Sequence, residues 1–182
     1  MNFQSKQVIL ENGLRLTDLE ESPQLDVTIE GADQIDVNTR TTIIGYGCGA
    51  QTQIKIVGNA SKEFVIIGDF TKRSEKLGQN EKNVVPIEVI PMAYKCVAKQ
   101  IEQLFGGITV LRMAKAKAGP VITDNNNFII DWKFDTKDTK EWTDINTKIK
   151  AIPGVIETGI LTDSGTHLTI YLGREDGTVD KL

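Results

Sequence analysis

Short apolar runs alternate with polar, glycine-containing segments along the first half of the chain. Residues 26–29 and 64–67 are β-rich runs, and each is followed by a glycine and by acidic residues. The continuous apolar run of residues 64–67 is typical of a strand buried on both faces of a parallel sheet. Residues 51–60 fit a helix, although their apolar residues also suit a strand. The pattern therefore predicts parallel strands separated by polar loops.

A different pattern begins near residue 84. Residues 85–90 read as a strand, and Pro91 suits the first turn of a helix whose apolar face carries Val97, Ile101 and Leu104. A second amphipathic helix over residues 142–149 ends before Pro153 and Gly154. Further strands are predicted at residues 110–113, 121–124, 128–132, 155–156 and 168–172, with a tight hairpin at residues 125–127. This half resembles a small α/β sandwich with antiparallel pairing.

Composition and charge argue against several classes of partner and site. Apolar residues make up 40% of the 182 residues and charged residues 25%, which is ordinary for a globular protein. The net charge of -4 argues against nucleic acid and anionic membranes as the main partner. Cys48 and Cys96 form no metal-ligand spacing and no disulfide framework. We expect a cytoplasmic protein without a membrane span, because no apolar run is long enough and the first residues do not read as a signal peptide.

The candidate chemistry lies where the predicted strands end. Glu30-Gly31-Ala32-Asp33 follows the first strand, and ligands of open α/β sheets bind outside the carboxyl ends of the strands. Paired acids there can accept hydrogen bonds from sugar hydroxyls or move protons. Acidic turns also form for local reasons, because Asp side chains cap their own backbone, so both interpretations stay open.

Other charged and glycine positions also have two interpretations. Gly45, Gly47 and Gly49 could cradle a phosphate or form a flexible loop. Lys72, after the second strand, could hold an anion or be a solvated charge. Arg112, with the lysines that follow it, is interpreted as a solvated basic patch at a strand end.

Four longer runs in this order resemble the ribose-5-phosphate isomerase A family, particularly its animal members. The runs are residues 30–33, residues 86–93 (PIEVIPMA), residues 119–125 (GPVITDN) and residues 152–159 (IPGVIETG). Several such runs in the right order are a stronger signal than one glycine-rich loop. The resemblance extends from Phe3 to Gly177.

The resemblance implies an α/β fold. An incomplete doubly wound parallel sheet, Rossmann-like, would comprise residues 1–84 and 158–182. A small α/β sandwich domain, ferredoxin-like, would comprise residues 85–157. The family interconverts ribose 5-phosphate and ribulose 5-phosphate through an enediolate in the pentose phosphate pathway, without a metal or other cofactor. The implied partners are a sugar phosphate and either further copies of the chain or a full-length relative, with no nucleic acid and no membrane.

The family's site residues transfer only in part. Asp33 is the retained catalytic candidate. The implied substrate-binding residues are Glu30, Gly31, Ala32, Asp33, Gly45, Gly47 and Lys72. Glu30 stands where the family has a shorter aspartate, and Tyr46 interrupts the family's glycines. Ile54 occupies the position of the glutamate that acts as the base, and Ile44 occupies that of a lysine.

These departures shape the functional expectation. The family's first strand, phosphate loop and helix would precede Met1, so we expect an N-terminally truncated member with a degenerate site. An isoleucine cannot accept a proton, and general base catalysis contributes roughly 10²–10⁴ in rate. We therefore expect an isomerase-family protein whose activity is lost or strongly reduced. The alternative is a non-catalytic sugar-phosphate-binding protein or an assembly partner of an active isomerase.

Overall fold

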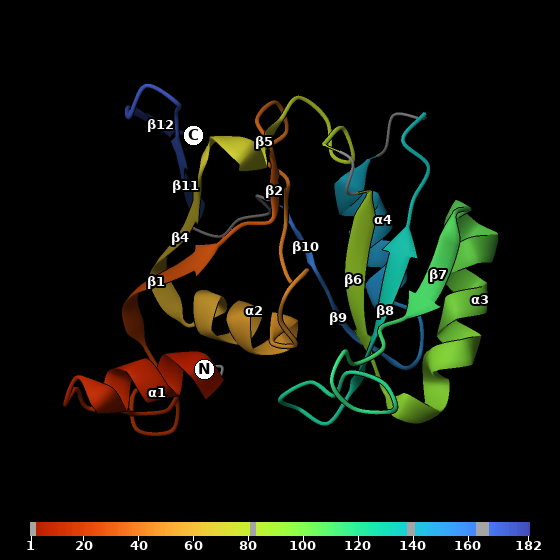
Figure 1. Ribbon diagram of the computed structural model, residues 1–182, viewed down its shortest axis with the longest axis horizontal. Helices are drawn as coiled ribbons and strands as arrows, with labels where there is room; N and C mark the ends of the chain where they lie inside the picture. The colour runs from red at the N-terminus through yellow and green to blue at the C-terminus, as the bar shows by residue number, and fades with distance from the viewer. Residues whose placement is uncertain (1–2, 81–82, 138–140, 163–167) are drawn as a thin grey trace.

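A parallel sheet carries the first part of the fold. The computed structural model describes residues 3–80, 83–137, 141–162 and 168–182. In this sheet the strands are ordered β1 (Leu25–Gly31), β4 (Ser61–Gly68), β11 (Leu168–Gly173) and β12 (Val179–Lys181) (Figure 1). The first three run parallel, and β12 is antiparallel to β11. The predicted α/β class with parallel strands is confirmed.

The helix α2 (Gln51–Asn59) packs against β1 and β4, which settles the choice between helix and strand for this segment. Ile54 and Gly58 are its buried positions together with Gln51. Gly58 is required because a side chain there would run into the Phe64 ring, 2.6 Å away. The helix therefore lies close to the sheet and covers one of its faces.

Burial of β4 is less complete than its apolar run predicts. Phe64, Val65 and Ile66 are buried, but Ile67 is exposed. On the neighbouring strand β1, Val27 and Ile29 are exposed as well. These residues share one face of the sheet, because parallel partners in register point the same way. The expectation of burial on both faces is therefore wrong at Ile67, although Val65 on the same face is buried.

A second sheet of short strands joins the two halves of the chain. Its order is β10 (Ile160–Leu161), β3 (Thr42–Ile43), β2 (Gln34–Asp36) and β5 (Arg73–Ser74). Strands of two or three residues give no alternating pattern, so the sequence did not predict them. The remaining elements of this half are α1 (Phe3–Glu11) and the 3-10 turn η1 (Phe70–Lys72).

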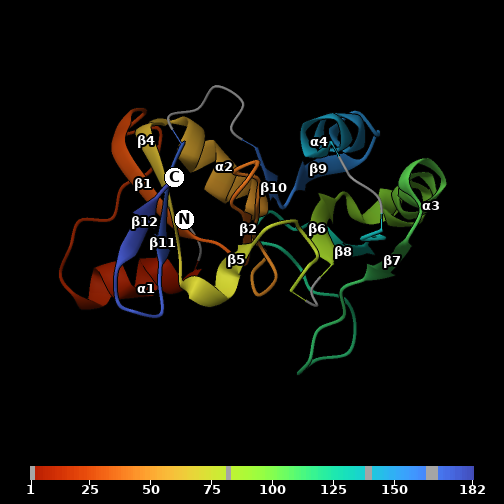
Figure 2. The same ribbon diagram turned by 90° about the horizontal axis from the view of Figure 1, so that it is seen from above.

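The third sheet is antiparallel and corresponds to the predicted sandwich. Its order is β7 (Ile108–Leu111), β8 (Phe128–Lys133), β6 (Val84–Val89) and β9 (Val155–Thr158). The helices α3 (Tyr94–Phe105) and α4 (Trp142–Lys150) lie on the same side of this sheet, and η2 (Pro91–Ala93) leads into α3 (Figure 2). Val97 and Ile101 of α3 and Ile145 and Ile149 of α4 are buried against it, as their spacing predicts.

Two local predictions need correction. Leu104 is exposed, because the face of α3 that packs on the sheet runs through Val97, Ile101 and Phe105, and Leu104 lies beside it. Residues 121–124 form a loop rather than a strand. The predicted tight turn is nevertheless present: Thr123 N donates to the Asn127 carbonyl (2.9 Å), and Asn126 has a φ of 61°.

The two halves share a hydrophobic core. Around the third sheet the core contains Val85, Ile87 and Trp132, and it also takes in Ile43, Leu77 and Ile160 from outside residues 85–157. The proposed domain boundaries stay a prediction. No helix in the described ranges is long and apolar enough to cross a membrane.

Candidate functional site

The acidic segment lies where the first strand of the parallel sheet ends. Ala32 N donates to the Ile67 carbonyl (2.9 Å), which extends the ladder between β1 and β4. Asp33 N donates to the Ile43 carbonyl (2.9 Å) and so turns the chain toward β3. Glu30 and Asp33 are both half-buried at this turn, while Gly31 is exposed. The structure thus places both acids at the carboxyl end of β1, as the sequence predicted.

The glycine-rich loop of residues 44–50 packs directly against Asp33. Tyr46 N donates to Asp33 Oδ2 (2.8 Å). Gly45 has a φ of 99°, and a side chain there would come within 2.6 Å of Gln51 Nε2. Gly47, by contrast, has open space around it. The structure therefore brings two predicted groups together, and it requires a glycine at position 45 but not at 47.

Arg112 holds this loop from the other half of the molecule. Its Nη1 donates to the carbonyls of Gly45 (2.8 Å) and Cys48 (3.1 Å). Its Nε and Nη2 form a bidentate pair with Asp131 (2.9 and 2.5 Å), and the two side chains are only 14% and 21% exposed. The interpretation of Arg112 as a solvated charge is wrong, because four acceptors enclose its guanidinium.

Negative charge accumulates beside the loop. Burial raises the pKa of Glu30 above its ordinary value, the neighbouring Asp33 charge raises it further, and a hydrogen bond from Gly31 N opposes both. Burial also raises the pKa of the Cys48 thiol, with Glu30 and Asp33 contributing in the same direction. A carboxyl group with a raised pKa exchanges its proton closer to neutral pH than an ordinary glutamate does. Glu30 is therefore a candidate for proton transfer at this turn.

Ile44 and Ile54, which the resemblance aligns with the family's lysine and glutamate, belong to the hydrophobic core. Ile44 is 1% exposed and Ile54 is 7% exposed, and both lie in one buried cluster with Ile35, Phe64 and Ile66. Neither side chain can accept a proton or carry a charge. The site therefore has carboxylates that can receive hydroxyl hydrogen bonds, but the two positions expected to supply the base and the cation are apolar.

Lys72 lies just beyond the end of β4, in η1. Its Nζ donates to Thr71 Oγ1 (3.2 Å) and is 3.7 Å from Asp69 Oδ2. Asp69 also caps the turn by accepting from Thr71 Oγ1 and from Thr71 N (2.8 Å), and these two hydrogen bonds lower its pKa. The ammonium of Lys72 is thus held by its own turn, and its role in substrate binding stays a prediction.

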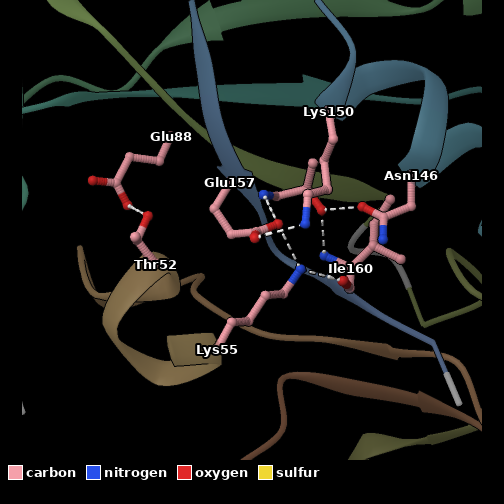
Figure 3. A network of polar contacts seen from close by, with 8 residues as sticks. Thr52, Lys55, Glu88, Asn146, Lys150, Glu157 and Ile160 are labelled. Atoms are coloured by element: carbon pink, nitrogen blue, oxygen red, sulfur yellow. Dashed lines mark hydrogen bonds and ion pairs between the residues drawn. The ribbon is translucent and has the colours of Figure 1, made fainter. Parts of the chain in front are cut away.

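Sequence reasoning missed a buried carboxylate next to this region. Glu88, on β6, is fully buried and accepts hydrogen bonds from Thr52 Oγ1 (2.7 Å), Thr123 Oγ1 (2.8 Å) and Asn127 Nδ2 (2.9 Å) (Figure 3 shows the first). It ties the first turn of α2 to the turn after residue 123. A glutamate inside an otherwise apolar strand was the available signal, because buried charges need partners.

Within the described residues, no group of three or more histidine, cysteine or acidic side chains is arranged to hold a metal ion. The groups that the site presents are its carboxylates, its backbone amides and its loop. The carboxylates of Glu30 and Asp33 suit a ligand with several hydroxyl groups.

Comparisons with known proteins identify the family of this chain. The model of the family "Ribose 5-phosphate isomerase A (phosphoriboisomerase A)" matches residues 1–177. The ribose-5-phosphate isomerase of Dictyostelium discoideum is 48% identical, and the match covers 97% of this chain and 75% of that protein. The human ribose-5-phosphate isomerase is 46% identical over 98% of this chain. This chain spans only 56% of the length of the human protein.

Solved structures give the same result. A D-ribose-5-phosphate isomerase in complex with phospho-erythronic acid superposes with a TM-score of 0.88 and 37% identity. Ribose 5-phosphate isomerase A from Methanocaldococcus jannaschii superposes with a TM-score of 0.87 and 36% identity. Each superposition covers all of this chain and 75% of the other. The chain therefore belongs to the ribose 5-phosphate isomerase A family.

Proposed function

We propose that this chain binds ribose 5-phosphate and ribulose 5-phosphate at the Asp33 site and interconverts them far more slowly than relatives that carry the glutamate and the lysine. The reaction would be that of the pentose phosphate pathway in the cytoplasm. One observation carries the proposal: Ile54 and Ile44 are buried in a hydrophobic cluster, while Asp33 and the loop against it are in place. The relative solved with phospho-erythronic acid supports a sugar phosphate as the ligand.

The expected chemistry follows from what each group can do. Interconversion moves a proton between two sugar carbons through an enediolate, so it needs a base and donors for the oxyanion. With Ile54 at the base position, the rate falls by roughly 10²–10⁴. The loss of a cation at Ile44 removes oxyanion stabilisation of about 3 kcal/mol. These losses need not add, because groups that act in one step are coupled. Glu30 and Asp33 remain to bind hydroxyl groups and to carry residual proton transfer.

An isomerisation assay with ribose 5-phosphate tests the proposal. The wild-type chain is compared with Ile54→Glu, with the matched control Ile54→Gln, and with the Ile54→Glu/Ile44→Lys double variant. The glutamine has the size and polarity of the glutamate but cannot act as a base. We expect wild-type turnover to be at least about a hundredfold below that of the Dictyostelium relative assayed alongside. We expect the glutamate, but not the glutamine, to raise turnover.

The outcomes separate chemistry from binding and from folding. Turnover of the wild type close to that of the relative would contradict the proposal and make Glu30 the candidate base. Titration calorimetry with ribose 5-phosphate, on the wild type and on Asp33→Asn, checks binding on its own. If Asp33→Asn leaves the affinity unchanged, the ligand does not bind at this turn. Melting curves of every variant show which ones fold.

An assembly role is the second candidate, and the exposed apolar face of the parallel sheet favours it. Val27, Ile29 and Ile67 share that face. We expect the wild type to self-associate, or to co-elute with an active isomerase, in size-exclusion chromatography with light scattering. Ile29→Lys is expected to abolish this, whereas Ile108→Lys, at an exposed position on β7 of the third sheet, is the matched control. A monomeric wild type that does not bind the active relative would exclude the assembly role.

A further inference from the structure

A cavity of about 360 Å³ lies between α2, β4 and the segment formed by α4, β9 and β10. Its charged and amide lining, here called the polar wall, includes Lys55, Asn146, Lys150 and Glu157. Its apolar lining, here called the apolar wall, consists of Ile56, Phe64, Ile160 and Leu161. The predicted substrate-binding residues and the two core isoleucines do not line it. The volume is within the range of about 300–1,000 Å³ that is usual for small-molecule sites.

Two ammonium groups flank one carboxylate in this wall (Figure 3). Lys55 Nζ donates to Glu157 Oε1 (2.9 Å) and to the Ile160 carbonyl (2.6 Å). Lys150 Nζ donates to Glu157 Oε2 (2.9 Å). The side chains of Lys55 and Glu157 are only 15% and 11% exposed, so water screens this group weakly. Two positive charges and one negative charge leave the wall with a net positive charge.

The wall also has more hydrogen-bond donors than its own acceptors use. An ammonium group has three N–H bonds, and the contacts above use two on Lys55 and one on Lys150. Asn146 Oδ1 accepts from Thr158 Oγ1 (2.5 Å), which fixes the orientation of the amide. The Asn146 Nδ2 group is therefore directed away from that hydroxyl (Figure 3). Both of its N–H donors remain available for a ligand.

We propose that this cavity is a second site, which binds a small oxyanion, either free phosphate or a phosphate monoester, between Lys55, Lys150 and Asn146. Positively charged donors suit such a ligand, because charge-assisted hydrogen bonds to an oxyanion are about twice as strong as neutral ones. The apolar wall suits the carbon part of a monoester. This proposal does not depend on the function assigned to the Asp33 site.

Protonation of Lys55 links the site to pH. Burial lowers the pKa of Lys55 to about 8, and the Glu157 charge opposes that shift while Lys150 adds to it. A bound anion favours the charged ammonium, so binding draws a proton onto Lys55 near and above this pH. Affinity for an anion of constant charge should therefore fall as the pH rises through about 8.

The test is a calorimetric titration of the full chain with inorganic phosphate near neutral pH. Asn146→Asp is the sharpest variant, because its carboxylate can still accept from Thr158 while it replaces the free N–H donors with a negative charge. Lys150→Gln removes one ammonium at the rim of the cavity. Lys148→Gln is the matched control, since that lysine lies on the same helix and pairs with Asp144.

We expect saturable phosphate binding, about tenfold or greater weakening in Asn146→Asp and Lys150→Gln, and no change in Lys148→Gln. Titration with sulfate, whose charge is constant, should show weaker binding at about pH 9 than at pH 7. Displacement of phosphate by ribose 5-phosphate assigns the site to a monoester, and no displacement assigns it to free phosphate. No saturable binding up to about 50 mM phosphate, or equal affinity in Asn146→Asp and the wild type, would overturn the proposal.

Discussion

Replacing Arg112 with methionine tests whether the two halves of the molecule cooperate in holding the glycine-rich loop. Methionine keeps much of the apolar stem but removes the guanidinium. The change leaves the Asp131 carboxylate without its cation, and the carbonyls of Gly45 and Cys48 lose a donor. Breaking a buried ion pair costs roughly 3–5 kcal/mol, and an exposed pair is worth about 0–1 kcal/mol. At 14% and 21% exposure this pair is nearer the buried case, so we expect a loss of about 3 kcal/mol.

A double-mutant cycle with Asp131→Asn separates the ion pair from the loop contacts. Urea unfolding gives the free energy of unfolding of the wild type, both single variants and the double variant. We expect a coupling energy of about 1–3 kcal/mol between the two positions. The part of the Arg112 loss that remains in the Asp131→Asn background reports the two carbonyl contacts.

The loop itself can be followed through Cys48. In a Cys96→Ser background, the rate at which an aromatic disulfide reagent modifies Cys48 reports how often the loop opens. We expect Arg112→Met to raise this rate at least about tenfold at constant pH. A loss below about 0.5 kcal/mol, together with an unchanged modification rate, would refute the conclusion that Arg112 holds the loop.

Three further predictions follow from single contacts. Gly45→Ala should lower the free energy of unfolding by about 1–3 kcal/mol, because of its positive φ and the close amide, whereas Gly47→Ala should change it little; equal losses in urea unfolding would contradict this. The pKa of Lys55 falls from 10.5 in the unfolded chain to about 8 in the fold, so the unfolded state binds more protons between these pH values and stability rises with pH there. In urea unfolding, the free energy of unfolding of the wild type minus that of Lys55→Met should accordingly rise by about 2 kcal/mol between about pH 7 and pH 10. The same difference at both pH values would count against the lowered pKa of Lys55. Glu88→Gln should cost about 1–2 kcal/mol in the same assay, because hydrogen bonds from Thr52, Thr123 and Asn127 to a carboxylate are stronger than those to a neutral amide, while the exposed Glu175→Gln should change nothing measurable.

The longer elements could be predicted because their patterns are local. The spacing of Val97 and Ile101 predicted a helix with one buried face, and the run at residues 64–67 predicted an inner strand. The position of Asp33 also followed from the sequence, because a β-rich run ended just before it. These conclusions need only neighbouring residues and the periods of helix and strand.

The features that escaped prediction depend on contacts between distant parts of the chain. Arg112 and the Gly45 carbonyl are 67 positions apart, and nothing near Arg112 in the sequence indicates that its charge is enclosed. The buried pair of Lys55 and Glu157 joins positions 102 apart. Such pairs form only once two sheets are packed together, so the sequence shows the charged residues without showing their partners.

The isoleucines at positions 44 and 54 are best understood together. Both side chains lie in one buried cluster, so a lone glutamate or a lone lysine there would be an unpaired buried charge. We expect Ile54→Glu and Ile44→Lys each to lower the free energy of unfolding by about 3 kcal/mol or more. The double variant should lose less than the sum by about 1–3 kcal/mol, because the two charges can then compensate each other. Urea unfolding of all four proteins measures this coupling. A strictly additive result would mean that the two positions changed independently, and that restoring the pair does not recover the family's arrangement of charges.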